Sequence, residues 1–267
     1  MKRVAALGGL LVGICALASA QSTTGDRVVV PARNTDRPRV VNAKTIYGPI
    51  TVKTYNGKEV IVETERASNS DRKPDVVDGL KRIDIPRGGL EVEEENNIVK
   101  VRLSPANRSG LIISVPPDTS LQLESTHATI TVDGVHGDID AGTVHADIRM
   151  TNVSGTVSAN TTHGNLKISM DRVDAGKPLS FSTVHGDIDV ALPADARANV
   201  KMSSLQGEIY SDFEIRLTGG QPVTEKSDSP EGRFRIRMDR TITGTINGGG
   251  AEASFRTVHG RILLRKK

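Results

Sequence analysis

The sequence predicts an all-β protein, a single-domain β-solenoid similar to a parallel β-helix, with rungs of about 18 residues. The first observation is a glycine or alanine every nine residues, at Ala128, Gly137, Ala146, Gly155 and Gly164. The second is that residues 18 positions apart are chemically alike, as in the columns Leu121, Ile139, Val157 and Ile130, Ile148, Leu166. A short fixed repeat is typical of stacked units that cannot bury their apolar faces alone. Each rung is therefore expected to lie on the next.

An antiparallel β-meander is the alternative fold, because a His-Gly pair can also form a two-residue hairpin loop. Val135 and Val153, which precede alternate corners of the repeat, distinguish the two folds. A solenoid buries these side chains at its edge, whereas a meander leaves them on its outer face. Two apolar residues in the same position of the repeat favour the solenoid.

Residues 1–20 have the pattern of a secretory signal peptide. Lys2 and Arg3 give a charged start, residues 4–17 are apolar, and Ala18-Ser19-Ala20 resembles a cleavage site. We therefore expect an exported protein that is periplasmic, cell-surface or secreted. The chain's one cysteine, Cys15, lies in this segment, so the mature chain must be stabilised by packing and backbone pairing without disulfides. No later apolar run is long enough to predict a transmembrane segment.

Composition limits the possible partners. The formal net charge of +3 includes the two basic residues of the signal peptide, so the mature chain is nearly neutral. The chain contains four Phe, three Tyr and no Trp. Single-stranded nucleic-acid sites depend on aromatic faces for stacking, so we expect no nucleic-acid partner.

Residues 21–38 are predicted to be a polar leader, and residues 39–119 the N-terminal β-rich part of the domain. Alternating apolar residues predict strands between 40 and 62, with Asn56-Gly57 as a hairpin turn. The charged stretch 66–88 interrupts the pattern and could hold one short helix around 76–82. Further strands are expected over 90–92, 98–103 and 111–115, before Pro116-Pro117 ends this part.

Residues 120–267 are predicted to form the β-strand repeat. Each unit has about five strand residues followed by a four-residue corner, and extra residues fall in polar stretches such as 171–177. A hairpin insertion is expected near 212–240. Its two arms would be residues 213–217 and 234–238.

All six histidines precede a glycine or alanine at a corner, at positions 127, 136, 145, 163, 185 and 259. A structural interpretation is that these positions need a left-handed backbone, which histidine tolerates better than most residues. The other interpretation is metal binding by the column His127, His145 and His163. Other corners use Gln206 or Tyr47 in place of histidine, and no cysteine or carboxylate column accompanies the imidazoles. The sequence therefore favours the structural role and predicts no metal site, with an envelope metal-binding protein as the alternative.

Two pairs of aspartates are the candidates for catalysis in the sequence. The pairs Asp138/Asp140 and Asp187/Asp189 each share an outer strand face and could in principle act as acid and base. An exposed flat sheet offers little burial to tune such carboxylates. Aspartates do not recur from rung to rung as a calcium roll requires, since Asn165 follows Asp147. We also find no nucleophile, zinc-protease, phosphate-loop or dinucleotide motif. We therefore predict no enzyme, no catalytic residues and no cofactor; a polysaccharide-active β-helix enzyme is the second alternative.

The repeated Thr-x-His/Asn-Gly-Asp-Ile pattern, preceded by Val115-Pro116, resembles a bacterial family labelled putative adhesin. This family is a β-strand-repeat domain of unknown function in exported and cell-envelope proteins. The resemblance covers about residues 40–264, and the residues that carry it are 126–132, 135–140, 143–148, 161–168, 183–190 and 257–264. It implies a β-solenoid and a non-enzymatic envelope role, and it supplies no catalytic residues. We therefore expect an adhesin-like structural or interaction module with an unknown protein or polymer partner.

Overall fold

The structure is a computed structural model that describes residues 26–33, 38–65, 76–77, 80–81, 89–219, 224–228, 234–238 and 241–267. The predicted signal peptide and half of the predicted leader lie outside these ranges and stay predictions. Within the ranges the chain forms strands and turns, and no helix there is long and apolar enough to cross a membrane.

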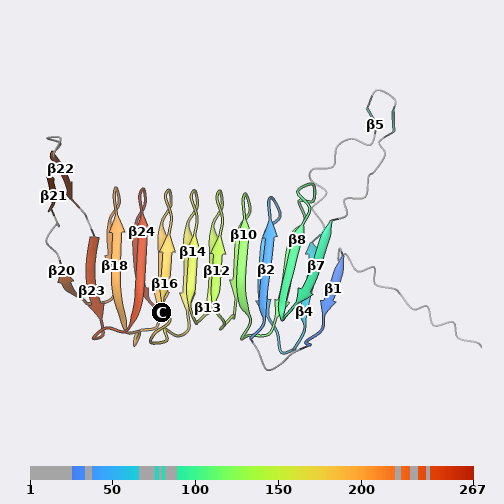
Figure 1. The fold of residues 1–267 in the computed structure, drawn as a ribbon, viewed down its shortest axis with the longest axis horizontal. Coiled ribbons are helices and arrows are strands. Elements are labelled where there is room, and N and C mark those ends of the chain that lie inside the picture. The colour runs from blue at the N-terminus through green and yellow to red at the C-terminus, as the bar shows by residue number, and fades with distance from the viewer. Residues whose placement is uncertain are drawn as a thin grey trace, which may run out of the picture.

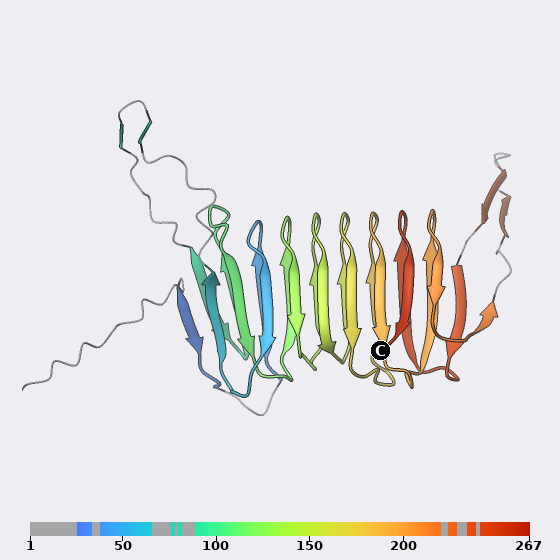
Figure 2. The same ribbon diagram turned by 180° about the vertical axis from the view of Figure 1, so that it is seen from behind.

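Two large sheets lie face to face and form the body of the molecule (Figures 1 and 2). In spatial order, the first sheet contains ten strands: β1 (Arg27–Val30), β4 (Val60–Glu65), β9 (Gly110–Val115), β3 (Ile50–Thr54), β11 (Ile130–Asp133), β13 (Ile148–Val153), β15 (Leu166–Met170), β17 (Ile188–Leu192), β25 (Ile262–Lys266) and β19 (Ile209–Ser211). The second contains eleven: β20 (Ile215–Gly219), β23 (Thr241–Ile246), β18 (Ala198–Ser204), β24 (Ala251–Thr257), β16 (Leu179–Ser182), β14 (Val157–Asn160), β12 (Ile139–Gly142), β10 (Ser120–Ser125), β2 (Val40–Thr45), β8 (Ile98–Leu103) and β7 (Leu90–Glu95).

Parallel pairing in register confirms the predicted solenoid. Ile139 lies opposite Leu121 on one side and Val157 on the other, and Ile148 lies between Ile130 and Leu166. Residues 18 positions apart are therefore neighbours in adjacent rungs. The alternative antiparallel meander is wrong for the repeat, and Val135 and Val153 have no exposed surface.

The core lies between the two sheets and follows from period-two alternation along each strand. In β10 the sequence SLQLES buries alternate residues, and β24 repeats this pattern over its full length. The buried apolar side chains from both sheets form one continuous cluster. Phe181 and Phe255 contact each other in it with ring centroids 5.3 Å apart. Stacking like residues on like thus gives one elongated core.

At both ends of the solenoid, spatial order departs from chain order. The rung made by β2 and β3 lies between the β8–β9 and β10–β11 rungs. The last rung, β24–β25, lies between β16–β17 and β18–β19. In Figure 1 these rungs appear as blue β2 among green strands and red β24 among orange ones. The expectation that consecutive rungs follow the order of the chain is therefore wrong at the ends. A rung can lie between two others wherever its inward-facing residues match theirs, whatever its place in the sequence.

Antiparallel strands flank the parallel stack at each end. The strand β4 pairs with β9, β7 with β8, and β23 with β18. Antiparallel strands at a sheet edge limit the parallel edge that another chain could pair with, although the first sheet ends on β19, which pairs with β25 in parallel.

Two details of the sequence prediction are wrong. Residues 213–217 do not pair with 234–238: β20 pairs with β23, which places Phe213 in the core, and β22 (Phe234–Met238) pairs with β21 (Thr224–Asp228). In place of the helix expected around 76–82, the described residues there form the short strands β5 (Val76–Val77) and β6 (Leu80–Lys81). Both errors fall where the 18-residue columns give no information.

Candidate functional site: a column of stacked imidazoles

The short loops along the top edge of Figure 1 join strands of the second sheet to strands of the first. The loops after β2, β10, β12, β14, β16, β18 and β24 each have a buried hydroxyl at their start. Thr161 Oγ1 donates to the carbonyl oxygen of Ala146 in the preceding corner at 3.0 Å. Thr183 and Thr257 make equivalent bonds, at 3.0 Å and 3.1 Å. A buried hydroxyl needs such a partner, so the threonine column links each corner to its neighbour.

Glycine or alanine follows the histidine in each corner because adjacent corners approach backbone to backbone. A Cβ built on Gly186 would lie 2.0 Å from the carbonyl oxygen of Gly164, and one built on Gly260 would lie 1.9 Å from that of Gly186. At these two positions even the methyl group of alanine would clash, so the backbone requires glycine. The glycine–alanine repeat in the sequence thus marks close contact between rungs.

The histidines do not adopt the left-handed backbone that the sequence suggested. The described non-glycine residues with positive φ are Asn96, Asn97, Asn152 and Asn247. The backbone of each corner histidine is instead paired with the previous corner: His145 N–H donates to Thr126 O at 2.9 Å, and His163 N–H to Val144 O at 2.8 Å. The parallel ladder continues through the corner, so the imidazole is directed outward.

Five exposed imidazoles and one phenol ring stack into what we call the imidazole column: Tyr47, His127, His145, His163, His185 and His259. Successive ring centroids lie 5.2, 5.1, 5.2, 4.8 and 4.6 Å apart. The planes are tilted by 20–26° near Tyr47 and by 2° at the other end.

The predicted column of His127, His145 and His163 is therefore present, and the column is longer than its 18-residue spacing indicated. Other residues continue it at both ends. The Arg108 guanidinium carbon lies 4.9 Å from the centre of the Tyr47 ring, and Gln206 N–H bonds to the carbonyl of Val258, beside His259. His136 lies at the alternate corner, outside the column.

Stacking bears on the metal-binding alternative. The lone pair of an imidazole nitrogen lies in the ring plane, so parallel stacked rings direct their lone pairs side by side. A tetrahedral metal site needs ligands that converge. Among the residues that the structure describes, no three His, Cys, Asp or Glu side chains form a group suited to a metal ion. The column geometry therefore lends the metal alternative no support.

A second column, which the sequence reasoning missed, runs beside the imidazoles. Asp147 Oδ1 accepts the N–H of Asn165 at 2.9 Å, Asn165 Oδ1 accepts that of Asp187 at 2.9 Å, and Asp187 Oδ1 accepts that of Arg261 at 2.8 Å. Hydrogen bonding by the Arg261 side chain, at 2.6 Å from Asp187 Oδ2, lowers the pKa of Asp187. These side chains hold successive corners together. The sequence signal for this column is that Asp147 and Asn165, 18 residues apart, occupy the same position of the repeat.

The acidic pairs singled out in the sequence lie on the surface, mostly in ion pairs. Asp138 Oδ1 lies 2.9 Å from Lys177 Nζ, and this hydrogen bond lowers the pKa of Asp138. Asp189 lies 2.9 Å from Arg265 Nε. Asp140 lies in register between Gln122 and Ser158 on the outer face of the second sheet. The structure brings neither pair into an enclosed site.

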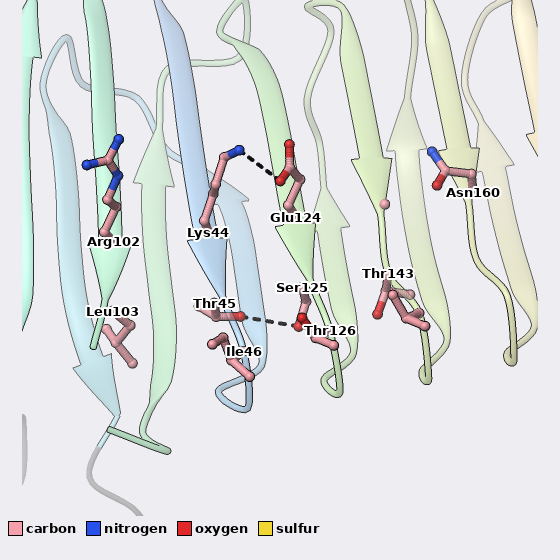
Figure 3. Close-up of a pocket in the computed structure, with 12 residues that line it drawn as sticks. Lys44, Thr45, Ile46, Arg102, Leu103, Glu124, Ser125, Thr126, Thr143 and Asn160 are labelled. Atoms are coloured by element: carbon pink, nitrogen blue, oxygen red, sulfur yellow. Dashed lines mark hydrogen bonds and ion pairs between the residues drawn. The ribbon is translucent and has the colours of Figure 1, made fainter. Parts of the chain in front are cut away.

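A shallow groove of about 510 Å³ adjoins the imidazole column on the outer face of the second sheet (Figure 3). It forms where Gly142, without a side chain, lies in register between Glu124 and Asn160. Lys44 and Arg102 line one end, and Lys44 Nζ lies 2.8 Å from Glu124 Oε2. The remaining wall includes Ile46, Thr126 and Val144, which directly precede Tyr47, His127 and His145. Groove and column are thus one continuous surface along the corner.

Residues 119–247 match the family model of the Toastrack domain, DUF4097. This match confirms the resemblance inferred from the repeat at the level of a β-repeat family.

Two solved structures align with the chain. A putative cell adhesion protein from Clostridium sporogenes ATCC 15579 is 11% identical, with a TM-score of 0.48, and the alignment covers 91% of this chain and 99% of that one. A putative adhesin from Parabacteroides distasonis ATCC 8503 is 8% identical, with a TM-score of 0.20, covering 91% and 95%. No curated protein matches the chain.

Proposed function

We propose that the protein is an exported, non-enzymatic module of the cell envelope that binds a partner in an adhesin-like manner along its corner surface. The observation that carries this proposal is the imidazole column with its adjoining groove. Identical exposed groups recur at 4.6–5.2 Å along a rigid stack of rungs, and a groove runs into them. Regular spacing over many rungs suits an extended ligand better than a compact substrate.

The surrounding structure supports a binding role. The corners are fixed by buried threonines, by backbone contacts between small residues and by the Asp–Asn column, so the exposed rings are held in place before any ligand arrives. A preorganised surface loses less conformational entropy on binding. Export rests on the signal-peptide pattern of residues 1–20.

Fractionation of cells tests the export half of the proposal. A tagged full chain should lose about 20 N-terminal residues and leave the cytoplasm, whereas a version without residues 2–20 should stay inside. An unprocessed cytoplasmic full chain would contradict the proposal.

Site-specific photocrosslinking in living cells tests the binding half. A photoreactive residue in place of Val144, which lines the groove, should give a discrete crosslinked product. The same residue in place of Lys167, exposed on the outer face of the first sheet, is the matched control. Equal yields at both positions would refute a corner-specific partner.

A further inference from the structure

We propose that the imidazole column and its groove bind a linear polyanion, a phosphate- or carboxylate-bearing polymer, and that protonation of the histidines strengthens this binding. The inference rests on the proposed function, since it names the partner class for the same corner surface. Histidine is the side chain whose ordinary titration falls between about pH 5 and pH 8. Five exposed imidazoles lie in a row along this edge.

Spacing makes the charges interdependent. Neighbouring rings lie 4.6–5.2 Å apart, so two protonated neighbours repel each other. A bound polyanion relieves this repulsion. By linkage, if protonation strengthens polyanion binding, polyanion binding promotes protonation to the same extent.

Acidic groups around the column already have partners. Glu124 lies 2.8 Å from Lys44, Asp147 2.6 Å from Arg149, and Asp187 2.6 Å from Arg261; Glu208 accepts a hydrogen bond from the Tyr210 hydroxyl. These carboxylates are therefore engaged before the imidazoles acquire charge, so an external anion is the natural counter-charge for a protonated column.

Cationic groups extend the same edge at both ends. Arg108 lies over Tyr47, and Arg102 lines the adjoining groove beside the Lys44–Glu124 ion pair. At the opposite end Arg256 directly precedes the buried Thr257 of the His259 corner, and Arg261, which follows that corner, is paired with Asp187. Protonation would join two cationic ends into one continuous basic row. A linear polymer with closely spaced charges can follow such a row, whereas a single small anion meets only one or two imidazoles.

Glutamine provides a conservative way to remove the titrating groups. Gln206 occupies the column position beside His259 in the natural sequence, so the corner accommodates this side chain. The test variant carries H127Q, H145Q, H163Q, H185Q and H259Q. The matched control is H136Q, because His136 is exposed but lies at the alternate corner.

The experiment measures the affinity of the purified mature chain for labelled long-chain inorganic polyphosphate by fluorescence anisotropy. Wild-type protein and H136Q should bind about tenfold or more tightly at about pH 5.5 than at about pH 8, and added salt should weaken that binding. The five-glutamine variant should lose the pH dependence. Circular dichroism checks that each variant is folded. If the five-site variant does not fold, the double variant H145Q/H185Q is used instead, and the pH dependence of its binding should be intermediate.

Three outcomes would overturn the inference: pH-independent binding by the wild type, retained pH dependence in the glutamine variant, or equal loss in H136Q. Binding to phosphatidylglycerol vesicles without binding to polyphosphate would also overturn it, by pointing to a membrane surface. If polyphosphate does not bind but crosslinking at position 144 persists, the inference fails and the proposed function stands. If crosslinking at position 144 is also lost, both the inference and the proposed function fail.

Discussion

Replacing Ile148 with alanine probes the stacked interior directly. Its side chain has no exposed surface and lies between Ile130 and Leu166 in adjacent rungs. The substitution removes three buried carbon atoms, worth about 2.4 kcal/mol at about 0.8 kcal/mol each. The cavity left between two rungs adds to this, and comparable substitutions cost about 2–5 kcal/mol. We expect a loss of about 3–4 kcal/mol in the free energy of unfolding.

Urea denaturation followed by circular dichroism measures this loss. The matched control is Arg149→Ala, one residue further along the same strand, where the side chain is about half exposed and pairs with Asp147. An exposed ion pair contributes about 0–1 kcal/mol, so the control should lose no more than that. Because a shift of one residue exchanges the two faces of a strand, similar losses in both variants, or a larger loss in R149A, would refute the register.

Three further predictions concern the corners. Gly186→Ala should destabilise the protein by at least about 2 kcal/mol, because the new Cβ would lie 2.0 Å from a backbone oxygen at a φ of 155°. The control Gly176→Ala is also at positive φ (84°) but has no atom within 4 Å of the new Cβ, so it should cost about 1 kcal/mol in the same denaturation assay. A larger loss in the control than in Gly186→Ala would contradict the close contact between corners. Because Arg261 lowers the folded-state pKa of Asp187, this pair contributes stability above about pH 4 that is lost as the pH falls through the folded pKa. The melting temperature of Arg261→Ala should therefore fall less on acidification than that of the wild type. An equal fall in both proteins would be evidence against the pairing. Excess zinc should leave the melting temperature unchanged, since a metal that binds the folded state must raise it; a rise that His145→Gln abolishes would restore the metal alternative.

Uniform columns made most of the fold predictable from the sequence. Apolar residues at 18-residue spacing, such as Ile130, Ile148 and Leu166, required parallel stacking to share an interior, and the structure pairs them in that register. The order of the terminal rungs was not predictable. Phe255 pairs with Phe181 across 74 residues of sequence, and no fixed period indicates such a neighbour.

The candidate site was predicted in part. The 18-residue spacing placed His127, His145 and His163 in one column, and the shared corner motif marked His185 and His259 as equivalent positions. Their places in the column depended on an offset of 22 residues from His163 to His185 and of 74 residues from His185 to His259, which the 18-residue spacing does not reveal. The left-handed backbone was a wrong explanation, because parallel hydrogen bonding through the corner, rather than a special φ, holds each histidine. The groove exists because Gly142 has no side chain, whereas its neighbours in register, Glu124 and Asn160, have one.

Cysteine crosslinking of adjacent rungs is the most direct measurement of the stacking and of the inserted last rung. Residues 21–267 contain no cysteine and offer a clean background, and Ser180 lies opposite Ser254 on the outer face of the second sheet. Neighbouring strands are about 4.8 Å apart, within reach of a disulfide, whereas two rungs exceed it. Mild oxidation of S180C/S254C should therefore form an intramolecular disulfide, seen by mass spectrometry and gel mobility. The control pair S158C/S254C, two rungs apart, should stay reduced; a disulfide in the control pair and none in the test pair would contradict the rung order and the column built on it.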